Sequence, residues 1–139
     1  MLKLGKIIII TIAMLFNSCK SQKHIGSTKN EYIISYKKAV LYGCINEATN
    51  GSFAEFSRAN NDLGTAIETA VLYHSDVLKA KELGAQLSKN IREIKYSDYG
   101  GKKPIFSDCI NFAFSKSVDS IARLKYKNLK KSKIEYKTK

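Results

Sequence analysis

Three cysteines and two histidines are the residues of this 139-residue chain best suited to covalent or metal chemistry. A catalytic cysteine needs a histidine held beside it, and a metal site needs several ligands at regular spacings. The sequence contains no His-x-x-Glu-His, no Cys-x-x-Cys and no glycine-rich phosphate loop. His24 lies in a polar segment, and His74 stands alone at a predicted helix end, where capping or packing is its simplest role. We therefore predict no catalytic residues, no metal site, no cofactor and no enzymatic activity.

The first cysteine, Cys19, directly follows a short apolar stretch at the N-terminus. Lys3 and Lys6 precede this stretch, which covers residues 7–16 and is too short to span a bilayer, since a helix needs about 20 apolar residues. The order of positive charge, apolar stretch, Ser18 and cysteine is similar to a bacterial lipoprotein signal. We therefore expect cleavage after residues 1–18, acylation of Cys19 and a lipid-anchored periplasmic protein. The alternative is an ordinary signal peptide with an incidental cysteine.

The other two cysteines, Cys44 and Cys109, lie on the apolar sides of the first and last predicted helices. Export places them in an oxidising compartment, and an even number of thiols remains once Cys19 is acylated. Both facts favour a disulfide between them, although two buried free thiols are the alternative. Closing a loop of this length stabilises a fold by about 4 kcal/mol in the chain-entropy model.

Amphipathic helices are predicted for most of the chain. Apolar residues recur at three- and four-residue steps within 31–48, 53–71, 77–94 and 110–124. Capping-box spacing at Thr28-x-x-Glu31 and at Ser52-x-x-Glu55 marks the first two helix starts. Polar residues and a glycine weaken the middle of the second helix, which could therefore be two shorter ones. No stretch alternates with a period of two, so we predict an all-α fold, a small bundle of four to five amphipathic helices with one disulfide.

Positive charge is concentrated near the C-terminus. The chain has 24 Lys and Arg against 12 Asp and Glu, and residues 123–139 hold eight basic residues against one acidic residue. We expect a tether over 19–29, a helical domain over 30–126 and a basic tail over 127–139. Because the chain is exported, nucleic acid is not an expected partner. The tail is then either a solvated end or a contact to anionic lipid beside the anchor.

Two segments together resemble a known family. The first predicted helix contains residues 36–45, YKKAVLYGCI, and the last begins with residues 107–112, SDCINF. A cysteine in an early helix, a helical middle, a loop and a Cys-aliphatic-Asx-aromatic helix start resemble the type VI secretion amidase immunity proteins, over roughly residues 31–125. The resemblance implies a periplasmic helical homodimer that binds a peptidoglycan-cleaving amidase of cysteine and histidine type. Such a protein inhibits the enzyme by placing a loop in its active-site cleft.

The loop expected to bind the effector joins the third and last predicted helices. It comprises Tyr96, Ser97, Asp98, Tyr99, Gly100, Gly101, Lys102 and Lys103. Tyrosines anchor many interfaces, paired glycines permit a narrow tip, and lysines attract an acidic rim. The principal alternative function is a structural or adaptor lipoprotein whose basic tail contacts lipid or polymer. A hydrolase whose site is assembled from distant residues is a third possibility.

Homodimerisation is expected on a second ground. Phe53, Phe56 and Phe112 supply more apolar surface than a core of this size is expected to bury. With the resemblance, this predicts a two-fold symmetric homodimer.

Replacing the expected lipidation site tests the anchor. Cys19→Ser removes the thiol that acylation requires, so we expect the protein to move from the membrane fraction to the soluble periplasmic fraction of its host. Ser18→Ala keeps a small residue before the cysteine and should leave the protein in the membrane fraction. Immunoblotting of the two fractions measures the change, and a Cys19→Ser variant that stays in the membrane would contradict lipidation.

Overall fold

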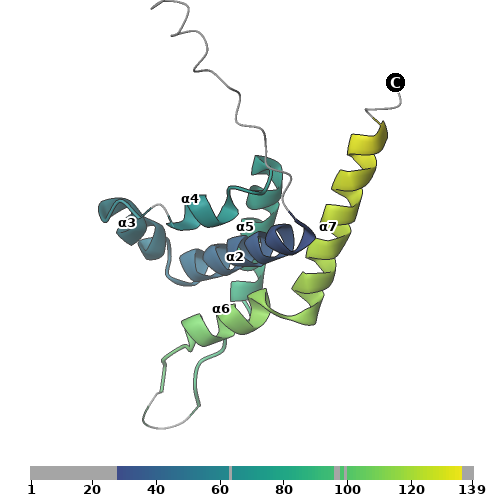
Figure 1. The fold of residues 1–139 in the computed structure, drawn as a ribbon. Helices are drawn as coiled ribbons and strands as arrows, with labels where there is room; N and C mark the ends of the chain where they lie inside the picture. Colours follow the sequence, from purple (N-terminus) through teal and green to yellow (C-terminus); the bar gives the residue numbers. More distant parts are fainter. Residues whose placement is uncertain (1–27, 63, 96–97, 99, 136–139) are drawn as a thin grey trace, which may run out of the picture.

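Six helices form within the part of the chain that the computed structural model describes, which is residues 28–62, 64–95, 98 and 100–135. In chain order they are α2 (Lys29–Ala48), α3 (Ser52–Ala59), α4 (Gly64–Thr69), α5 (His74–Ser88), α6 (Ile105–Ala113) and α7 (Lys116–Glu135) (Figure 1). These residues contain no strand, which confirms the predicted small all-α bundle. The signal segment 1–18 and most of the tether lie outside the described residues.

The central element of the bundle is α2, which packs against each of the other helices (Figure 1). The predicted capping box begins it, because Glu31 N donates to Thr28 Oγ1 (3.2 Å) and Thr28 N donates to Glu31 Oε2 (2.8 Å). The second predicted capping box is wrong, since Ser52 is already inside α3 and the N-cap is Gly51 in a left-handed conformation. Glycine adopts that conformation without strain, so the turn before α3 needs no side-chain cap.

Three predicted helices are divided or end early. The second is divided into α3 and α4 around Asn61, whose φ is 52°, which confirms the alternative of two shorter helices. The third ends at Ser88 and not near Ile94, because the backbone N–H groups after it bond three residues back and the chain turns so that Ile91 is buried beside the disulfide. The last is divided into α6 and α7 at Ser115, whose hydroxyl accepts a hydrogen bond from Val118 N (3.3 Å) and so caps α7.

Two buried clusters form the core, both built on α2. The larger joins α2 to α5, α6 and α7 and contains Tyr32, Ile33, Tyr36, Ala39, Val40, Leu72, Ala80, Ala113, Val118 and Ala122. The smaller contains Cys44, Ile45, Ile91 and Cys109. The Cys44 and Cys109 sulfurs lie at disulfide distance, 2.05 Å, and link α2 to α6 as the cysteine count predicted.

Close backbone contact between α2 and α5 depends on two glycines. A Cβ placed on Gly43 would lie 2.1 Å from Lys81 O, and one placed on Gly84 would lie 2.0 Å from Val40 O. Real Cβ atoms do not approach backbone this closely, so no other residue fits at either position without moving the helices apart. The fully buried Ala80 lies one turn before Gly84 on the same helix. The two helices therefore cross through small residues.

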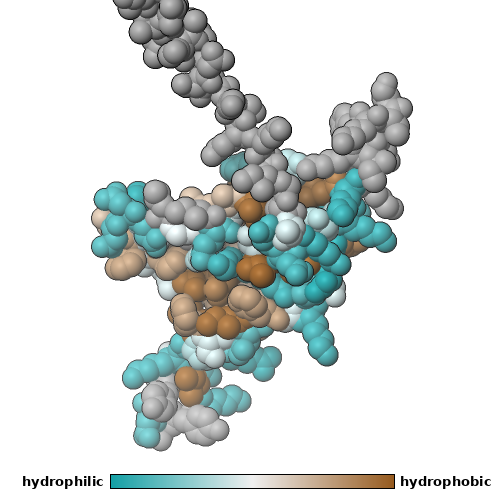
Figure 2. Space-filling view, viewed as in Figure 1, coloured by the Kyte–Doolittle hydropathy of each residue, from teal (hydrophilic) through white to brown (hydrophobic). Residues whose placement is uncertain are grey.

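The apolar surface differs from the one expected. Phe53 and Phe112 are half-buried and pack against the Cys44–Cys109 cluster, so the expectation that they add exposed apolar surface is wrong. The ring of Phe56 is 65% exposed, as expected. A second exposed set follows α6 and its C-cap at four-residue steps and comprises Phe106, Ile110 and Phe114. Figure 2 shows hydrophobic side chains gathered over α6 and the neighbouring part of α2. Homodimerisation stays a prediction.

The last helix continues into the segment expected to be a tail. α7 extends to Glu135, and its Tyr126 and Leu129 pack against the larger cluster. The Tyr126 ring lies 5.4 Å from the Tyr32 ring, centroid to centroid. The lysines at 127 and 130 therefore lie on a packed helix, where both are exposed. Among the described residues, no helix has the length and apolar character needed to cross a membrane.

Substitution at the helix crossing tests the fold most simply. In an exposed helix, glycine to alanine stabilises a protein by about 0.5–1 kcal/mol, because it reduces the freedom of the unfolded chain. At position 84 we expect the opposite sign, a loss of about 1–3 kcal/mol, because the added methyl meets backbone of α2. Urea denaturation of Gly84→Ala measures this, with Lys79→Ala on the exposed face of α5 as control. Unchanged or increased stability of Gly84→Ala would contradict the close crossing.

Candidate functional site

The loop between α5 and α6 leaves the helical body on the side of α6 (Figure 1). Its two described arms, residues 91–95 and 100–104, are joined by a hydrogen bond in which Ile94 N donates to Lys102 O (2.9 Å). Of the eight residues predicted to bind an effector, Tyr96, Ser97 and Tyr99 lie outside the described residues. The other five, Asp98, Gly100, Gly101, Lys102 and Lys103, are all exposed on this one loop.

Both ends of this loop are fixed to the core. Ile91 is buried in the cluster around the disulfide, and Cys109 lies on the helix that follows the loop. Between these ends Gly101 has a φ of 75°, a left-handed conformation that glycine adopts at little cost. The loop therefore combines a base held by a covalent bond and apolar packing with an exposed outer part.

A buried hydrogen bond joins α2 to the first turn of α5. Tyr32, 1% exposed, donates from its hydroxyl to Asp76 Oδ2 (2.8 Å), and Asp76 is 7% exposed. Burial, followed by this hydrogen bond, raises the pKa of Tyr32 well above its ordinary value. Because neither group is open to solvent, the pair acts as a structural link between two helices. His74, two residues before Asp76, is exposed at the start of α5.

Two carboxylates outside the core connect α2 to its neighbours. Asp119 on α7 forms ion pairs with Lys37 on α2 (2.6 Å) and with Arg123, and Arg123 and then Lys37 lower its pKa from 3.8 to about 2. Glu68 on α4 accepts hydrogen bonds from Lys38 Nζ (2.8 Å) and from the Tyr42 hydroxyl. The bonds from Lys38 and then Tyr42 lower the pKa of Glu68, while burial and the bond to Glu68 raise that of Tyr42. In the described part of the chain, no three His, Cys, Asp or Glu side chains cluster as a metal site would require.

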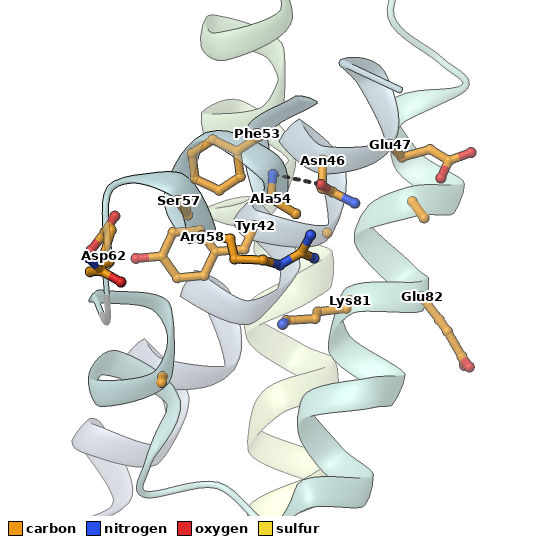
Figure 3. Close-up of a pocket in the computed structure, with 14 residues that line it drawn as sticks. Tyr42, Asn46, Glu47, Phe53, Ala54, Ser57, Arg58, Asp62, Lys81 and Glu82 are labelled. Atoms are coloured by element: carbon orange, nitrogen blue, oxygen red, sulfur yellow. Dashed lines mark hydrogen bonds between the residues drawn. The ribbon is translucent and has the colours of Figure 1, made fainter. Parts of the chain in front are cut away.

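A pocket of about 630 Å³ lies between α2, α3 and α5 (Figure 3). Tyr42 and Phe53 form an aromatic wall, with ring centroids 6.1 Å apart and planes inclined by 14°. Arg58 extends into the pocket from α3 and Lys81 from α5 (Figure 3). No local pattern predicts this pocket, because its lining residues come from α2, α3, α4, α5 and the turn before α4, which only packing brings together.

Comparison of the chain with protein-family models, with curated proteins and with solved structures found no match in any of the three.

The pKa of Asp119 makes the α2–α7 link dependent on pH. Because the folded-state pKa lies below the ordinary 3.8, the carboxylate stabilises the fold at neutral pH, and this stabilisation is lost as the pH falls through about 2. Asp119→Asn should therefore lower the Tm at pH 7, and its difference from wild type should shrink as the pH approaches 2. Glu55→Gln, at an exposed carboxylate of α3, is the control and should change the Tm little at any pH.

An NMR titration of the Asp119 side-chain carboxyl measures the pKa directly. A value near 3.8, or a difference in Tm that does not change with pH, would contradict the ion-pair assignment.

Proposed function

We propose that this chain is an immunity protein that binds and inhibits a peptidoglycan-cleaving amidase effector of type VI secretion. The α5–α6 loop enters the active-site cleft of that enzyme, and the protein itself does no chemistry. The observation that carries the proposal is the loop itself, whose exposed outer part is held on a fixed base. The class of the partner rests on the resemblance over residues 31–125.

A fixed base makes the loop suited to insertion. A free tail loses conformational entropy when it binds, whereas a loop closed by the Ile94–Lys102 hydrogen bond and the nearby disulfide has already lost much of it. Gly101, in its left-handed conformation, adds no side chain to the arm of residues 100–104 and so keeps it narrow there. Tyr96 and Tyr99, which the sequence predicts as aromatic anchors, complete the proposed contact.

The positive charge of the α5–α6 loop also supports its proposed role in binding the amidase. Lys102 and Lys103 are consecutive and exposed on the outer arm. A positive loop tip is attracted to a cleft with an acidic rim, which raises the association rate. Anchoring through Cys19 would hold the domain on the periplasmic side, where a peptidoglycan amidase acts, and residues 20–29 would serve as the tether.

A second candidate is an adaptor lipoprotein of the envelope that uses its basic C-terminal part. Exposed lysines at 127 and 130, on the packed helix α7, favour this candidate. Such a helix would bind vesicles of anionic lipid, and binding would weaken with salt. The immunity proposal requires no such binding.

Charge reversal on the loop tests the proposed function. The proposal predicts that a peptidoglycan amidase is encoded beside this chain in its host, and the wild-type mature protein should inhibit that enzyme. Lys102→Glu with Lys103→Glu should reduce the association rate by about tenfold or more, because an attraction becomes a repulsion. Lys79→Glu with Lys127→Glu makes the same change in net charge elsewhere and should change the rate much less. Stopped-flow association and residual amidase activity measure both effects, with the Tm as a check on folding.

Two outcomes would contradict the proposed function. One is a wild-type protein that leaves the amidase fully active. The other is a loop variant that associates and inhibits as well as wild type, which would place the blocking surface elsewhere.

A further inference from the structure

The pocket between α2, α3 and α5 has the size and construction of a small-molecule site. Its volume of about 630 Å³ lies within the range of about 300–1,000 Å³ that is typical of ligand pockets. Gly43 and Ala85 belong to its lining, so the helix crossing provides a floor with little side-chain bulk. The lining also contains the aromatic pair Tyr42 and Phe53.

Residues outside the pocket hold the rings of the aromatic wall, Tyr42 and Phe53, in position. The hydroxyl of Tyr42 donates to Glu68 on α4, so hydrogen bonding fixes the position of the Tyr42 ring. Phe53 packs against the disulfide cluster and also stacks with Tyr42. A preorganised aromatic surface costs little entropy when an apolar group of a ligand packs against it.

Two cations point into the same space without a carboxylate between them. Figure 3 shows Arg58 reaching from α3 toward α5 and Lys81 reaching from α5 toward α3. The ion pairs of the described residues involve Lys37, Lys38 and Arg123, and neither Arg58 nor Lys81 takes part in them. Like charges that face one another repel, and an anion between them removes that repulsion.

The lining also contains three carboxylates, Glu47, Asp62 and Glu82, but none of the ion pairs among the described residues joins one of them to Arg58 or Lys81. Figure 3 shows Glu47 and Glu82 directed away from the two cations. Asp62 Oδ1 accepts a hydrogen bond from Gly64 N (2.7 Å) at the turn before α4. The pocket lining also contains Ser57, whose hydroxyl oxygen is buried without a hydrogen-bond partner among the described residues. The part of the pocket between Arg58 and Lys81 thus presents positive charge beside an aromatic surface, and the lining adds one unsatisfied hydroxyl.

We propose that this pocket binds a small organic carboxylate, with its charged group between Arg58 and Lys81 and its apolar group against Tyr42 and Phe53. The planar guanidinium of arginine matches a carboxylate in a two-point hydrogen bond, and lysine adds a second, flexible donor. The carboxylate has two possible sources, a free aromatic acid or the C-terminus of a short peptide. The site is separate from the α5–α6 loop, so the proposal does not depend on the function assigned to that loop.

A matched pair of probes tests the charge requirement. NMR titration of the mature Cys19→Ser protein with 3-phenylpropionate should shift amide signals of α2, α3 and α5 around the pocket. The neutral 3-phenylpropionamide has the same ring and chain, and we expect it to bind at least about tenfold more weakly, a loss of about 1.4 kcal/mol. Acetate lacks the apolar group and should also bind more weakly.

Substitutions locate the site. Arg58→Gln and Lys81→Gln should each weaken binding of 3-phenylpropionate by about tenfold, because each removes one charge-assisted hydrogen bond. Lys79→Gln removes one positive charge from the exposed surface of the same helix α5 and should leave the affinity within about twofold. Both pocket residues are exposed, so the variants should keep the wild-type Tm, which far-UV circular dichroism checks.

A second pair of probes separates the two sources. Acetyl-Ala-Phe with a free C-terminus should bind more tightly than 3-phenylpropionate if the natural ligand is a peptide end, and no more tightly if it is a free acid. The amidated peptide should bind weakly in both cases.

Three results would overturn the proposal. The first is the absence of localised shifts up to about 10 mM probe, a concentration above ordinary weak affinities. The second is equal affinity for the acid and the amide, and the third is an equal loss of affinity in Lys79→Gln and in the two pocket variants.

Discussion

The close crossing of α2 and α5 is the constraint on which the rest of the structure depends. Gly43 and Gly84 let the two backbones meet where any side chain would collide with a carbonyl oxygen. This contact fixes α5 against the central helix, and α4, α6 and α7 then pack around α2. It also sets the floor of the pocket, so that Lys81 on α5 lies opposite the aromatic wall that begins with Tyr42 on α2.

The disulfide extends this constraint to the surface of the molecule. It links α2 to α6 within the smaller buried cluster, where Ile91 also lies, so it holds the segments on both sides of the α5–α6 loop. The α5–α6 loop leaves the body from this fixed base, while its residues Gly100–Lys103 remain exposed. The pocket lies between α2, α3 and α5, and no residue of the α5–α6 loop lines it. The two proposed binding surfaces are therefore separate, a projecting loop and a pocket.

Patterns within short stretches of sequence predicted the helices and the disulfide. Apolar periodicity located the helices, and cysteine counting predicted the Cys44–Cys109 pair. Glycine in a helix normally lowers helix propensity, so no local pattern indicated that close packing requires Gly84. The break at Ser115 was missed because apolar residues continue across it at helical spacing. The pocket could not be predicted, since Arg58 and Lys81 lie 23 positions apart and are brought together only by packing.

Hydrogen exchange of the mature protein, alone and with the peptidoglycan amidase that the proposal predicts as its partner, tests the central claim most directly. If the α5–α6 loop enters the cleft of that enzyme, protection should increase at residues 94–103, while exchange in α7 and around the pocket should change little. Protection confined to the exposed face of α6 or to α7, with none at residues 94–103, would contradict the account.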